Sequence, residues 1–297
     1  MRRLVLLALV GLVAQLVDGS LGMGYGVTSA TLLVAAGIGP AAASAAIHFS
    51  EIGTSLVSGL SHHKLGNTDW RTVGVLALPG FAGAFAGATL LVNLDTDIAV
   101  PVVAGILIGL GTYVTWRFLA PRRLRFGSRP SARFLAPLGL FAGALDAVGG
   151  GGWGPVGTSS LLASGRLEPR KVVGSVDTAE FVVAVGGSLG FLVGLGAQGI
   201  AWGYVAALMV GGMVAAPIAA ALVRYLPARV LGVAAGGLIV LTNLQTLADW
   251  ANASGVTEGL LASLVFTLWV LWTSWAVKLE QGDALPAGRP RATPVGA

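Results

Sequence analysis

The sequence predicts an all-α polytopic membrane protein built from two inverted-topology repeats. Each repeat is expected to hold a half-helix hairpin and about three spanning helices, and an extra helix follows at the carboxyl end. Of the 297 residues, 55% are hydrophobic and only 10% are Asp, Glu, Lys or Arg, whereas soluble domains carry about 25% charge. Long apolar runs recur along the whole chain, as spanning helices of roughly 20 residues require. One glycine-rich motif occurs twice.

The apolar segments divide the chain into two similar series. The first series is Leu4–Val17, Val27–Ala36, Ala41–Leu60, Val73–Val92 and Ile98–Leu119. The second is Phe134–Leu145, Val156–Ala163, Val172–Leu195, Ile200–Val223 and Val230–Leu247, and a last span follows over Leu260–Val277. We therefore expect a first repeat over 1–119, a basic cytoplasmic linker over 120–133, a second repeat over 134–248, an extra transmembrane helix over 257–278 and a disordered tail over 279–297.

The repeated motif runs from Asp18 to Gly26 and again from Asp146 to Gly154. Its aligned pairs are Gly22 with Gly150, Gly24 with Gly152, and Tyr25 with Trp153. Farther along each half, His48 aligns with Asp177 and Glu51 aligns with Glu180. An aromatic residue inside a glycine cluster, preceded by Asp and followed by a helix that carries Glu, is unlikely to recur by chance.

The distribution of basic residues predicts the orientation of the halves. The first two segments of each half are shorter than the roughly 17 residues that a span needs, so we expect a hairpin that enters and leaves on one side. Each half then makes three full crossings, and the second half is inverted. This arrangement places every Lys and Arg except Arg2 and Arg3 on one face, which the positive-inside rule makes cytoplasmic, together with the carboxyl terminus. Those two arginines also resemble the start of a signal peptide, but cleavage would break the repeat.

Five acidic residues are expected at membrane depth: Asp18, Glu51, Asp146, Asp177 and Glu180. No Lys or Arg accompanies them, and an ionisable group at the bilayer centre costs about 2.5–3.5 kcal/mol on insertion scales. Some of the five should therefore be protonated at neutral pH, which is the chemistry of a proton carrier. His48 and Glu51 share one helix face with Ser44, Ser55 and Ser58. The alternative is that these groups only hydrogen-bond between helices.

The glycine clusters predict an anion site. The amino terminus of a half-helix offers free N–H groups and about half a positive charge, and transporters use such broken helices near the midplane. We expect a site lined by Gly22, Gly24, Tyr25, Gly26, Gly150, Gly152, Trp153 and Gly154. The alternative is a tight hairpin packed through glycine, and both can hold at once.

Other chemistries have little support. The chain has no Cys and three His, so no metal site and no cofactor is expected, and no enzyme motif is found. The basic pI reflects cytoplasmic loops and not nucleic-acid binding. Gly194, Gly196 and Gly199 match a dinucleotide fingerprint by letter, but no strand precedes them. His62 and His63 are expected to be solvated in a cytoplasmic loop.

The two motifs and the helices that carry Glu51 and Glu180 resemble the TauE/SafE family of bacterial transporters over roughly Leu4 to Leu247. The resemblance implies transport of a sulfur-containing anion, such as sulfite, a sulfonate or sulfoacetate, across the inner membrane. An anion channel, a carrier of another small anion and a membrane-embedded enzyme are the alternatives. The expected partners are a small anionic substrate, the lipid bilayer and protons. Export is the expected direction, because an inside-negative potential expels anions, and proton-coupled uptake is the alternative. The sequence leaves the oligomeric state open, with a homodimer as one arrangement.

Overall fold

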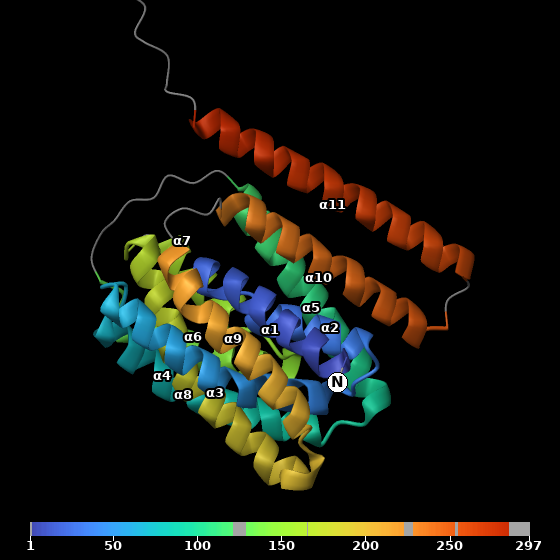
Figure 1. Ribbon diagram of the computed structural model, residues 1–297, viewed down its shortest axis with the longest axis horizontal. Coiled ribbons are helices and arrows are strands. Elements are labelled where there is room, and N and C mark those ends of the chain that lie inside the picture. Colours follow the sequence, from blue (N-terminus) through green and yellow to red (C-terminus); the bar gives the residue numbers. More distant parts are fainter. Residues whose placement is uncertain (1, 121–128, 165, 223–227, 253–254, 285–297) are drawn as a thin grey trace, which may run out of the picture.

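The computed structural model describes residues 2–120, 129–164, 166–222, 228–252 and 255–284, and every regular element in these ranges is a helix (Figure 1). The first half holds α1 (Arg2–Leu21), α2 (Tyr25–Ala35), α3 (Pro40–Lys64), α4 (Trp70–Val92) and α5 (Thr96–Leu119). The second holds α6 (Ala132–Gly149), α7 (Trp153–Ser164), α8 (Pro169–Leu195), the 3₁₀ turn η1 (Ala197–Gly199), α9 (Trp202–Leu222) and α10 (Ala228–Trp250), and α11 (Gly255–Ala284) follows.

By length and composition, seven helices of the described ranges could cross a membrane: α1, α4, α5, α6, α8, α9 and α11. The predicted all-α membrane class is thereby confirmed. Helix α3 has 25 residues and is long enough to cross, but its polar side chains lower its hydropathy below that of the seven. These polar side chains become the centre of the site described below.

The first arm of each hairpin is longer than the sequence predicted. Helix α1 has 20 residues and α6 has 18, whereas the apolar runs ended at Val17 and Leu145. The apolar runs stop at Asp18 and Asp146, but both residues lie inside the last turns of these helices. The second arms, α2 and α7, are short, with 11 and 12 residues.

The two halves exchange their first helices. Helix α1 packs against α9 of the second half, and its counterpart α6 packs against α4 of the first half. Glycines allow both contacts, since a Cβ on Gly11 would lie 2.2 Å from the Leu208 carbonyl oxygen and one on Gly83 would lie 2.0 Å from the Leu140 carbonyl oxygen. Small residues at such positions let helix backbones touch. Neither half therefore packs as a separate unit.

Helices α3 and α8 cross at the centre of the molecule and run in opposite directions. Ser55 contacts Glu180, and Ser58, farther along α3, contacts Asp177, which comes earlier in α8. Helices α4 and α8 run in the same direction, because Gly186 and Gly190 lie against Phe81 and Phe85 in that order.

Helices α5 and α10 pack against one another, and α11 lies outside them at the upper edge of Figure 1, against α10. The Trp269 indole of α11 donates a hydrogen bond to the Ala234 carbonyl oxygen at 2.9 Å. Helix α11 extends beyond both ends of the predicted span. Most of the predicted linker (121–128) and most of the predicted tail (285–297) lie outside the described residues.

Candidate functional site

The repeated aspartates cap the second helix of each hairpin. Oδ1 of Asp146 accepts a hydrogen bond from the Trp153 backbone N–H at 3.0 Å, and Oδ1 of Asp18 accepts one from the Tyr25 N–H at 3.4 Å. A carboxylate at a helix amino terminus satisfies a free N–H group and complements the helix dipole. The chain therefore supplies its own anion at the first N–H of α7 and of α2.

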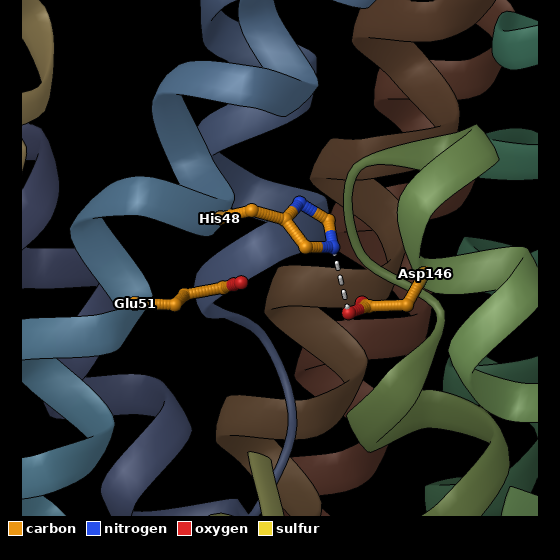
Figure 2. Close-up of side chains that lie close together, drawn as sticks. All are labelled: His48, Glu51 and Asp146. Atoms are coloured by element: carbon orange, nitrogen blue, oxygen red, sulfur yellow. Dashed lines mark ion pairs between the residues drawn. The ribbon is translucent and has the colours of Figure 1, made fainter. Parts of the chain in front are cut away.

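The second oxygen of Asp146 faces α3 from the opposite half. His48 Nε2 lies 3.2 Å from Asp146 Oδ2, and Glu51 lies one turn farther along α3, so the three side chains point toward one another (Figure 2). We name His48, Glu51 and Asp146 the histidine cluster. All three residues are buried, and neither Glu51 oxygen has a hydrogen-bond partner among the described residues. Buried charged groups without partners are costly, so a bound proton or cation would stabilise this cluster.

A second cluster occupies the equivalent place of the repeat. Asp18 of the first half meets Asp177 and Glu180 of α8, and we name these three residues the all-carboxylate cluster. Two of its hydrogen-bond donors come from α3, where the Ser58 hydroxyl donates to Asp177 and the Ser55 hydroxyl donates to Glu180 at 3.2 Å. The six residues predicted for proton coupling thus form two groups of three, each with an aspartate from one half and two residues from the other.

His62 belongs to this site, contrary to the prediction that it is solvated. It is fully buried in the last turn of α3, and its Nε2 lies 3.4 Å from Asp177 Oδ2. The Asn67 side chain lies 3.2 Å from His62 Nδ1. The signal was available in the sequence, because His62 extends the spacing of Ser55 and Ser58 by four residues along one face of α3. The charged residue Lys64, two positions later, instead suggested a solvated loop.

The two glycine motifs pack directly against one another. A Cβ on Gly26 would lie 2.6 Å from the Gly150 carbonyl oxygen, and one on Gly154 would lie 2.7 Å from the Gly22 carbonyl oxygen. Gly24 has φ +135° and Gly150 has φ +70°, values that favour glycine. A Cβ on Gly152 would meet the Asp146 backbone nitrogen at 2.7 Å. The glycines are therefore required for the contact between the two hairpins.

The aromatic side chains of these motifs are already hydrogen-bonded. The Trp153 indole donates to the Val176 carbonyl oxygen at 3.0 Å, and the Tyr25 hydroxyl pairs with the Ser50 hydroxyl at 2.9 Å. Both side chains are buried. In this conformation the Trp153 indole and the Tyr25 hydroxyl, two of the donors expected for an anion, are engaged within the protein.

Each cluster could accommodate a cation or bound protons. One ligand atom from each of its three residues lies within 4.8 Å of the other two. Among the described residues, the only basic side chains that pair with the clusters are His48 and His62. The histidine cluster offers an imidazole and the all-carboxylate cluster offers oxygen atoms, so the same metal would not suit both equally.

Comparison with known proteins identifies the family. The sulfite exporter TauE/SafE family matches residues 7–246. The chain belongs to the TauE/SafE family. It is also 46% identical over 273 residues to the probable membrane transporter protein YtnM of Bacillus subtilis (strain 168), an alignment that covers 91% of each chain. No solved structure matches. The TauE/SafE match ends before α11 and includes both clusters, so this chain is a multi-pass membrane protein of a transporter family.

Proposed function

We propose that this TauE/SafE chain is a secondary transporter that carries a small sulfur-containing anion across the bacterial inner membrane and couples its movement to protons. Sulfite, a sulfonate or sulfoacetate is the substrate class. The family supports the anion class, and the relative supports membrane transport. The observation that carries the coupling is the pair of buried clusters, because each gathers acidic groups without a Lys or Arg partner among the described residues.

The proton is the ion that both clusters can bind. They occupy equivalent positions of the repeat but differ in one donor, which is His48 in one and Asp177 in the other. Sodium and magnesium prefer oxygen donors, whereas transition metals prefer imidazole. A proton binds to a carboxylate and to an imidazole alike, and intramembrane acidic and histidine residues form proton relays in transporters. Two equivalent sites that bind the same ion therefore favour protons.

The opposite directions of α3 and α8 support an inverted repeat, in which equivalent helices cross the membrane in opposite senses. Such repeats move against one another in alternating access. Because the two glycine motifs pack directly against one another and the Tyr25 hydroxyl and Trp153 indole are already hydrogen-bonded, anion binding between the hairpins would require the two halves to separate. Protonation of Asp18 would weaken the hydrogen bond that it accepts from the Tyr25 N–H group, and protonation of Asp146 would weaken the bond from the Trp153 N–H group. The N–H group released in this way would be available to the substrate.

Export is the proposed direction. An inside-negative potential contributes about 2.3 kcal/mol per charge per 100 mV, so it drives anions outward without further energy. We place the carboxyl terminus in the cytoplasm, where the positive-inside rule puts basic residues.

The test is flux of sulfite, a short sulfonate and sulfoacetate in proteoliposomes under separately imposed pH and voltage gradients. The proposal requires saturable flux of at least one of these anions that responds to the pH gradient at zero voltage. Linear, much faster flux that responds to voltage alone would instead indicate an anion channel. Saturable flux of a different small anion, with none of the three transported, would overturn the substrate class.

A further inference from the structure

His62 lies between the all-carboxylate cluster and the surface of the molecule. It is fully buried in the last turn of α3. The turn that follows is exposed at Leu65 and Gly66, and Asn67 folds back from it onto the His62 ring. On the other side of the ring, Asp177 connects to Asp18 and Glu180 in the cluster. The imidazole is therefore a single buried group between an exposed turn and three buried carboxyl groups.

The hydrogen bond between Asn67 and His62 fixes where a neutral ring carries its proton. The Asn67 Nδ2 group can only donate, so His62 Nδ1 accepts and the ring proton lies on Nε2, facing Asp177. His48 has the opposite arrangement, because its Nδ1 lies 3.0 Å from the Ser44 carbonyl oxygen, which can only accept. The two buried histidines of α3 therefore differ when neutral: His62 presents a proton to a carboxylate, and His48 presents a bare nitrogen.

We propose that His62 transfers protons between the turn after α3 and the all-carboxylate cluster. This inference rests on the proton coupling proposed above and names the residue through which one cluster gains and loses protons. The acidic groups on its path are Asp177, Asp18 and Glu180, and its basic neighbours on α3 are His63 and Lys64.

The transfer conserves protons. When Asn67 turns away, a proton from water binds Nδ1 of the neutral ring and gives an imidazolium ion. The Nε2 proton then passes to Oδ2 of Asp177, and the ring is left neutral with its proton on Nδ1. The starting state returns by reverse transfer, in which Asp177 gives its proton back to Nε2 and Nδ1 releases its proton to water. Ser58, which donates to the same oxygen, keeps that carboxyl group oriented toward α3.

The test compares His62→Gln with His63→Gln in proteoliposomes. His63 is exposed and packs edge-on against Trp70, so its substitution controls for loss of one imidazole at the same end of α3. Net flux driven by a pH gradient should fall at least about tenfold in His62→Gln, in line with the loss of a general acid–base group. Exchange of labelled for unlabelled anion at equal pH, which needs no net proton movement, should stay within about twofold of the native rate, and His63→Gln should match the native protein in both assays.

The outcomes separate this inference from the proposed function. If native protein shows no pH-driven flux, the proposed coupling is wrong and the inference falls with it. If native flux is pH-driven but His62→Gln behaves like His63→Gln, His62 is not the transfer residue. Asn67→Ala provides a second measurement, since it frees Nδ1 without removing the ring. It should change pH-driven flux severalfold at unchanged exchange, and unchanged pH-driven flux in that variant would also overturn the inference.

Discussion

His48 Nε2 lies 3.2 Å from Asp146 Oδ2, although the two residues come from different halves of the chain. The other ring nitrogen, Nδ1, lies 3.0 Å from the Ser44 carbonyl oxygen and must donate to it. If His48 were neutral and Asp146 ionised, His48 Nε2 and Asp146 Oδ2 would each present a lone pair to the other. The contact is favourable only if the pair holds one further proton, either on the ring or on the carboxyl group. Under the proposed coupling, this is a proton that the transporter would hold between its two halves.

The cap made by Asp146 predicts a difference between two substitutions. Asp146→Asn keeps the Oδ1 acceptor for the Trp153 N–H and can donate to His48 Nε2, so its free energy of unfolding should stay within about 1 kcal/mol of native. Asp146→Ala leaves a buried N–H unpaired and should cost about 1–3 kcal/mol. Thermal unfolding in detergent measures both. Asp18→Ala should lower the free energy of unfolding by less, because the hydrogen bond from Tyr25 to Asp18 is longer. Equal losses of stability in Asp146→Asn and Asp146→Ala would contradict the capping role.

Glu51 and Glu180 are predicted to carry most of the pH dependence of transport. They are equivalent in the repeat, they are buried, and each belongs to one cluster. Glu51→Gln and Glu180→Gln preserve shape but cannot release a proton, so each should flatten the pH profile of flux and leave membrane insertion intact. Glu168→Gln is a matched control, since Glu168 is exposed and pairs with Arg170 at 2.9 Å. An unchanged pH profile in both buried variants would leave them with packing roles only.

The sequence predicted which residues carry charge at depth but not how they group. Composition and apolar length are local properties, so the helices and the buried positions of Glu51 and Glu180 could be inferred. The exchange of α1 and α6 between the halves is a tertiary property, and it decides that Asp146 meets His48 and not Asp177. His62 was missed for a related reason, since a neighbouring Lys64 indicates solvent while the burial of His62 depends on α8.

The glycine contact between the hairpins predicts a sharp sensitivity to small side chains. In Gly26→Ala the new methyl group would lie 2.6 Å from the Gly150 carbonyl oxygen, and backbone cannot move aside as a side chain can. We expect a loss of about 1–3 kcal/mol in the free energy of unfolding. Gly105→Ala in α5 has no atom within 4 Å and should be neutral or stabilising by up to about 1 kcal/mol. Similar thermal stability in both variants would argue against a tight contact.

Asp69 predicts a pH-dependent contribution to stability outside the membrane spans. Burial alone would raise the pKa of the Asp69 carboxyl, but hydrogen bonds from the Thr72 N–H and hydroxyl and the charges of Arg129 and Lys171 outweigh it and lower the pKa. The stabilisation is therefore present above the unfolded pKa of about 3.9 and is lost as the pH falls through the lower folded value. Asp69→Ala should cost about 1 kcal/mol at pH 7, and the difference from native should shrink toward pH 3. A difference that is constant with pH would show that the charge of Asp69 contributes nothing.

The last prediction concerns the sidedness of the two halves. Arg129 Nε lies 4.0 Å from Asp69 Oδ2, so the residues that precede α4 and α6 lie on the same side. Helix α4 has 23 residues, about 34 Å at 1.5 Å per residue, which spans the roughly 30 Å hydrocarbon core. Asn93, just after α4, must then lie on the opposite side from Ser131, just before α6. The positive-inside rule predicts that Ser131, which lies near basic residues, is on the cytoplasmic side. The native chain has no cysteine, so a single cysteine at each position can be labelled without background. In intact cells, an impermeant maleimide should label Asn93→Cys, and Ser131→Cys should react only after the membrane is opened. Labelling of both from the same side would exclude the inverted repeat, because α4 would then not cross.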